Sequence, residues 1–80
     1  MLPTYTPDAL RGVLSRHKLT GSQAARLLGV DSRTVRRWTS PDAIDSHREM
    51  PISAWWLLLL LTGEASIRQI IEAAGLELLP

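Results

Sequence analysis

The sequence predicts an all-α fold, a compact bundle of about five helices that contains a helix-turn-helix. Apolar residues recur three and four positions apart in successive segments, and most of these segments open with a capping residue or close at a glycine. The polar segment over residues 39–51 shows no alternation of polar and apolar residues of the kind expected of paired strands. At 80 residues, we expect a single domain over residues 1–80.

The first helix is expected over residues 7–17, after a loose N-terminal arm formed by residues 1–5. Thr6 is a capping residue, and Pro7 fits the first helical position because its missing N–H has no partner there. Leu10, Val13 and Leu14 recur at helical spacing and predict the inward face. Gly12 costs this helix about 1 kcal/mol relative to alanine unless another backbone packs against it.

Residues 20–40 are predicted to form the helix-turn-helix. Thr20 and Gln23 form a capping box at the start of its first helix, and Gly29 ends that helix in a left-handed conformation. Asp31 is a good cap for the second helix. The inward side of the first helix is apolar and is expected to comprise Ala24, Ala25, Leu27 and Leu28.

The second helix of this pair is predicted to present a basic face to solvent. Val35 and Trp38 lie three positions apart and face the core. The polar residues on the remaining sides are Ser32 at the leading end, Arg33 and Arg37 opposite the core, and Arg36 on a flank. Arginine suits contact with guanine in the major groove and with phosphate, so double-stranded DNA is the expected ligand. The alternative is a solvated face that binds nothing.

Charge is distributed unevenly along the chain. Residues 11–37 contain seven basic residues and one acidic residue, whereas the rest contains two basic and seven acidic residues. One half therefore attracts a polyanion while the other repels it, which would orient the protein on DNA.

The polar segment over residues 39–51 is long for a connection between helices. Two interpretations stay open: it is a mobile linker, or it lies along the DNA backbone with His47 or Arg48 contacting phosphate.

Two apolar helices are expected at the C-terminal end, over residues 52–62 and 66–74, as the core and possible dimer interface of residues 51–75. The first is apolar on all sides, so it needs cover on both of them, and the inward side of the second is expected to hold Ile67, Ile70, Ile71 and Ala74. We expect a homodimer interface at Trp55, Leu58, Leu61, Leu76, Leu78 and Leu79. Alternatively, the terminal leucines fold back on their own subunit.

The stretch QAARLLGVDSRTVRRW, residues 23–38, resembles the helix-turn-helix of the Cro and lambda-repressor-like group, often called Xre-like. Its markers are Ala25, Gly29, Val35 and Trp38. The resemblance implies a bundle of about five helices whose third helix reads the major groove. It also implies base contacts from Ser32, Arg33 and Arg37, with Arg36 nearby, and phosphate contacts from Thr20, Ser22 and Gln23.

The chain departs from this group at Gly21, where a polar phosphate-binding residue is frequent, and in the length of the loop over residues 39–50. It is similar to short phage or mobile-element repressors, including the anti-CRISPR-associated autorepressors. The resemblance therefore implies a homodimeric repressor that occupies a promoter at an inverted repeat.

Two other functions are weighed against this one. A protein-interaction module would bind a host or antitoxin-type partner through Trp55, Leu58 and Leu61. An excisionase-like architectural factor would carry a β wing after the basic helix, and no strand signals follow that helix.

Enzymatic, metal and cofactor sites are not expected. Cysteine is absent, only His17 and His47 are available as imidazole ligands, and no catalytic set or phosphate-binding glycine loop is recognisable. No small-molecule ligand is evident. The longest apolar run, residues 54–61, is too short to span a bilayer, and no signal peptide is recognisable, so a cytoplasmic location is expected.

Overall fold

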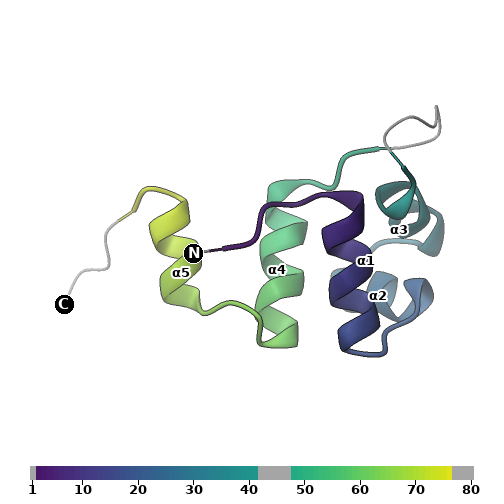
Figure 1. Cartoon of the computed structure of the whole chain (residues 1–80), viewed down its shortest axis with the longest axis horizontal. Coiled ribbons are helices and arrows are strands. Elements are labelled where there is room, and N and C mark those ends of the chain that lie inside the picture. The colour runs from purple at the N-terminus through teal and green to yellow at the C-terminus, as the bar shows by residue number, and fades with distance from the viewer. Residues whose placement is uncertain (1, 42–47, 77–80) are drawn as a thin grey trace.

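The computed structural model describes residues 2–41 and 48–76, which form five α-helices and no strand. In chain order the helices are α1 (Pro7–Arg16), α2 (Gly21–Leu28), α3 (Ser32–Thr39), α4 (Ile52–Thr62) and α5 (Ile67–Ala73). In Figure 1, α4 lies between α5 on one side and α1, α2 and α3 on the other. The all-α prediction is confirmed, and α1 and α5 are slightly shorter than expected.

The helix ends follow the predicted local chemistry. The Thr6 hydroxyl caps α1 by accepting a hydrogen bond from the Ala9 amide at 2.9 Å. At α2, Thr20 and Gln23 exchange both hydrogen bonds of a capping box. Gly29 closes α2 with a φ of 72°, a left-handed conformation that favours glycine. These devices depend on residues close in sequence, which is why the helix boundaries could be predicted.

The core lies among α1, α2, α3 and α4; α2 packs most extensively on α3, α1 packs on α3, and α4 packs on α2. Helix α4 contributes Trp55, Leu58 and Leu59, which are fully buried. The predicted inward residues of α1, α2 and α3 that are buried are Leu10, Val13, Leu14, Ala24, Ala25, Val35 and Trp38. Met50 and Ala65, on either side of α4, are also buried and were not predicted. Their burial places the ends of both connecting segments against the core.

Several residues expected to face inward are exposed instead. Leu27 on α2 is 45% exposed, and Ile52 and Leu57 are exposed on α4, a helix expected to be covered on both sides. Helix α5 buries none of its residues, and Ile67 is 65% exposed. The reason is that α5 lies beyond α4, away from the other helices (Figure 1), and Ile70 is its residue that packs against the core. The expected inward side of α5 is therefore wrong at Ile67 and Ala74.

The N-terminal arm is not loose, contrary to expectation. The Tyr5 hydroxyl donates a hydrogen bond of 2.6 Å to the carbonyl of Trp38, and the Trp55 indole donates one of 2.9 Å to the carbonyl of Pro3. The rings of Tyr5 and Trp55 meet edge to face with centroids 5.8 Å apart. The arm therefore joins the end of α3 to the centre of α4.

Candidate nucleic-acid interface

The outer face of α3 carries the predicted base-contacting residues. The turn at residues 29–31 separates α2 from α3, and the Asp31 carboxylate caps α3 by accepting hydrogen bonds from the Thr34 amide at 2.7 Å and the Thr34 hydroxyl at 2.8 Å. With Val35 and Trp38 buried, the opposite side of the helix faces solvent. The exposed residues there are Ser32, Arg33, Arg36 and Arg37, as predicted.

The three arginines of this face have no carboxylate partner among the described residues. Within the described part of the chain, Arg33, Arg36 and Arg37 form no ion pair, whereas Arg11 and Arg16 each have a carboxylate partner. The pKa of the Asp31 carboxyl is lowered, chiefly by the hydrogen bonds from Thr34 and to a smaller extent by the charges of Arg33 and Arg37. Asp31 therefore stays ionised as a cap while the guanidiniums remain available to an external anion.

The C-terminal end of α3 is held by donors from other parts of the chain. The last four carbonyls of a helix have no intrahelical partner. In α3 these are the carbonyls of residues 36–39; the first accepts hydrogen bonds from hydroxyls at the end of the helix itself, and the other three accept from other segments. Their donors are the hydroxyls of Thr39 and Ser40, the amide of Arg48, the hydroxyl of Tyr5 and the guanidinium of Arg11. This end of the basic helix is thus fixed to α1, to the N-terminal arm and to the segment before α4.

The start of α2 lies next to this helix and holds the predicted phosphate-contacting residues. Thr20, Ser22 and Gln23 are all exposed. The capping box uses the Thr20 oxygen and the Gln23 carbonyl oxygen as acceptors, which leaves the hydroxyl proton and the amide group of these side chains as donors. The amides of Gly21 and Ser22 have no protein partner in the described structure. This edge therefore presents several donors to solvent.

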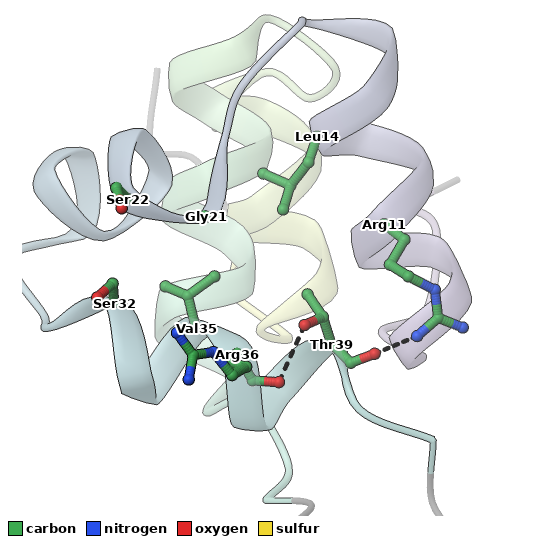
Figure 2. A pocket seen from close by; sticks show the side chains of 8 residues that line it. All are labelled: Arg11, Leu14, Gly21, Ser22, Ser32, Val35, Arg36 and Thr39. Carbon is green, nitrogen blue, oxygen red and sulfur yellow. Dashed lines mark hydrogen bonds between the residues drawn. The ribbon is translucent and has the colours of Figure 1, made fainter.

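A hollow of about 390 Å³ lies between α1, α2 and α3. Figure 2 shows Arg11 on α1, Ser22 at the start of α2 and Arg36 on α3 around it. The other lining residues are Leu14, Gly21, Ser32, Val35 and Thr39. Arg36 thus borders the hollow on the side of α3 that faces α1 and α2. The sequence had placed Arg36 on a flank of α3, but the neighbouring Arg11 belongs to a helix whose position cannot be read from local spacing.

Arg48, another predicted phosphate contact, lies at the same end of the molecule as the C-terminus of α3. Its amide donates a hydrogen bond of 3.3 Å to the Arg37 carbonyl, and the residue is exposed. His47, the other candidate in this segment, lies outside the described residues. The backbone contact places Arg48 beside the basic helix.

The predicted dimer interface needs a correction. Trp55 and Leu58 are 0% exposed because they form the core of their own subunit, so they cannot contact a second one without unfolding. The same burial removes two of the three residues through which the alternative protein-interaction module would bind. Leu61 and Leu76 are exposed, at 51% and 64%, and Leu78 and Leu79 lie outside the described residues.

The described residues hold neither a metal-ligating cluster nor a helix that could span a bilayer. Residues 2–41 and 48–76 contain no group of three or more potential metal-ligating side chains. None of their helices has the length and apolar character needed to cross a bilayer.

The fold and the outer face of α3 define a small all-α protein that presents a short basic helix. A comparison with known proteins identifies its family. The chain is 43% identical to the transcriptional repressor protein KorC of Escherichia coli over 65 residues, which cover 78% of this chain and 71% of KorC. The chain belongs to the family of this transcriptional repressor. No protein-family model matches it, and no solved structure does.

Proposed function

We propose that the chain is a DNA-binding transcriptional repressor of the Xre-like class, in which α2 and α3 form a helix-turn-helix and residues 1–80 form one domain. The observation that carries the proposal is the outer face of α3, where three arginines that form no ion pair among the described residues lie on a helix whose two ends are both anchored. A rigid helix with free guanidiniums on its outer side suits the major groove. Membership of the KorC family supports the same function.

In this proposal Arg33 and Arg37 are the principal base-reading residues, with Ser32 at the leading end of α3. Thr20, Ser22, Gln23 and Arg48 contact phosphates on either side of the groove. Phosphate contacts fix the register of the protein on the duplex, and base contacts select the sequence. Arg33→Ala is therefore expected to cost about 1 to 3 kcal/mol and to relax preference at one base pair.

The repressor acts as a homodimer on an inverted repeat, with the α3 helices of two subunits about 34 Å apart in successive major grooves. The exposed apolar side chains on and beside α4 and α5 support this proposal, because association of two subunits through them would remove apolar surface from water. Those side chains are Leu57, Leu61, Ile67 and Leu76.

The biological setting is a short regulator of phage or mobile-element type that occupies its own promoter in the cytoplasm. This part of the proposal is supported by the resemblance to short autorepressors. It assigns the protein no enzymatic activity and no cofactor.

The test is a fluorescence-anisotropy titration of the purified protein against the duplex upstream of its own gene and against a scrambled duplex, at two salt concentrations. We expect salt-sensitive binding that prefers the upstream duplex by roughly a thousandfold or more. Equal and weak binding to both duplexes would contradict autoregulation. Retention of full affinity by the double variant Arg33→Ala, Arg37→Ala would contradict the role of α3.

A further inference from the structure

We propose that the hollow between α1, α2 and α3 receives a phosphate group of the DNA backbone, with Arg36 as its principal ligand, so that Arg36 binds the backbone and does not read a base. The inference rests on the proposed DNA-binding function and assigns a task within it.

The position of Arg36 on α3 separates it from the two other arginines. Val35 and Trp38 fix the buried side of the helix, and the advance of about 100° per residue then puts Arg33 directly opposite the core. Arg36 and Arg37 fall on opposite flanks of Arg33. Arg36 borders the hollow and Arg37 does not. A guanidinium on the flank toward α1 and α2 lies at the edge of the face that would enter the groove, where the backbone of the duplex passes.

The hollow is lined by donors suited to a phosphate oxygen. Ser22 and Ser32 contribute hydroxyls, and Arg11 contributes a second guanidinium (Figure 2). Arg11 uses its two terminal nitrogens for Asp8 and the Thr39 carbonyl, so its charge is already paired and it forms a fixed wall of the hollow, which leaves Arg36 as the guanidinium available to a phosphate. Arg36 has no side-chain partner in the described structure and is free to turn toward an anion. No carboxylate lines the hollow.

Gly21 keeps the hollow open. A methyl group added at Gly21 would lie 3.9 Å from Cγ1 of Val35, an ordinary contact, with no other neighbour within 4 Å. The absence of a side chain therefore leaves space in front of α2. The space that a larger side chain would occupy at this position is therefore open to a phosphate at Arg36.

The first test separates phosphate binding from base reading. The variants Arg36→Gln and Arg33→Gln are titrated by fluorescence anisotropy against a labelled duplex that the protein prefers and against its scrambled form, over a range of salt. For Arg36→Gln we expect affinity to fall about tenfold on both duplexes, with the slope of log K against log salt reduced by about 0.9. For Arg33→Gln we expect a fall mainly on the preferred duplex. A loss confined to the preferred duplex in Arg36→Gln would overturn the proposal.

The second test closes the hollow without changing charge. Gly21→Leu is expected to weaken binding about as much as Arg36→Gln, whereas Gly21→Ala, whose methyl group fits, should have little effect. The double variant Gly21→Leu, Arg36→Gln should be no weaker than either single variant, because both remove one contact. Additive losses, or full affinity in Gly21→Leu, would overturn the proposal.

Two controls keep these results interpretable. Arg68→Gln removes the same charge from α5, away from the hollow, and should leave the salt slope unchanged. Thermal unfolding of each variant shows that the fold persists.

Inorganic phosphate, added as a competitor at constant ionic strength, distinguishes two sources of the phosphate group. If the hollow also accepts the free anion, phosphate should weaken wild-type binding more than Arg36→Gln binding. Equal inhibition of the two proteins means that the hollow takes the phosphate only as part of DNA. Failure of the wild-type chain to bind any duplex would contradict the proposed function itself, whereas normal binding with an unchanged slope in Arg36→Gln would contradict only this inference.

Discussion

Gly12 and Gly29 place opposite demands on the residue that occupies them. Gly12 lies inside α1, where glycine weakens the helix, and a methyl group added there would lie 3.2 Å from the Nη1 atom of Arg16, whose other two nitrogens bond Glu64. Gly29 closes α2 with a φ of 72°, and open space surrounds it. At Gly12 there is room for a methyl group if the Arg16 guanidinium shifts slightly. At Gly29 there is room for one, but the left-handed backbone disfavours any residue with a Cβ atom.

We therefore expect Gly12→Ala to stabilise the protein by less than about 1 kcal/mol, because alanine is the better helix former but the Arg16 guanidinium, hydrogen-bonded to Glu64, has to shift by a few tenths of an ångström. Gly29→Ala should destabilise it by about 1 to 2 kcal/mol, because alanine is strained in the left-handed region. Urea unfolding monitored by tryptophan fluorescence measures both changes. A shift of the same sign in the two variants would contradict this interpretation.

The two ends of α3 are stabilised by different kinds of interaction. Its N-terminus is capped locally by Asp31, and its C-terminus is held by tertiary donors, among them the Tyr5 hydroxyl. The Tyr5 ring also packs against Trp55. Removal of the hydroxyl alone therefore isolates the hydrogen bond from the ring packing.

For Tyr5→Phe we expect a loss of about 0.5 to 1.5 kcal/mol, because the Trp38 carbonyl loses its donor while the aromatic contact stays. Hydrogen exchange followed by mass spectrometry should quicken in the last turn of α3 and stay unchanged in α5, which serves as the internal control. Unchanged exchange at the end of α3 would show that the arm does not hold this helix.

The difference between interactions made within one segment and interactions made between segments explains how much could be predicted from sequence. The caps at Thr20 and Asp31 and the exposed arginines of α3 follow from spacing along one segment, and they were found. The anchoring of the arm by Tyr5 and the burial of Met50 depend on which segments meet in space, and no local pattern reports that. Helix α4 was the hardest case. It is apolar on all sides, so its sequence did not distinguish the core residues Trp55 and Leu58 from surface residues that could meet a second subunit.

Across the whole molecule, Glu64 connects the first helix to the segment after α4. Its carboxylate accepts hydrogen bonds from Nη2 and Nε of Arg16, at 2.7 and 3.1 Å, and Nε2 of His17 lies 2.7 Å from the same group. The hydrogen bonds from Arg16 are the largest cause of the lowered pKa of Glu64. The interaction joins residues 48 positions apart in the chain.

This lowered pKa gives the stability a defined pH dependence. A carboxyl whose pKa is lower in the folded state stabilises the fold above its unfolded pKa, and the contribution disappears as the pH falls through the folded pKa. We expect Glu64→Gln to lose up to about 1 kcal/mol at neutral pH and to show a shallower loss of stability on acidification, since the partners are largely exposed.

Melting temperatures measured from neutral pH to about pH 3 provide the test. Part of the acid dependence should remain, because the pKa of Asp31 is lowered as well. Glu72→Gln is the matched control, since Glu72 is exposed on α5 and forms no ion pair in the described structure. Identical acid profiles for wild type and Glu64→Gln would contradict the prediction.

The proposed dimer can be tested by placing a charge on its exposed apolar surface. Leu61→Glu places a charge on an exposed apolar position, so the subunit should fold while the dimer dissociates. Light scattering after size exclusion is expected to report a monomer, and affinity for an inverted repeat should fall far more than affinity for a single half-site. Ser53→Glu adds the same charge to another exposed position of α4 and is the control. A monomeric wild type would contradict the interface.

The anchoring of α3 has a consequence for how a family of such proteins can diversify. The helix is held by Val35 and Trp38 on its inner side, by Asp31 before it and by backbone carbonyls at its end. Of these, only the Asp31 cap is affected by the outward side chains of Arg33 and Arg37, whose charges are a minor cause of its lowered pKa. Those two positions can therefore change at little cost to folding, and if they read bases as proposed, one scaffold could supply a set of mutually orthogonal regulators that differ in two residues and ignore each other's operators.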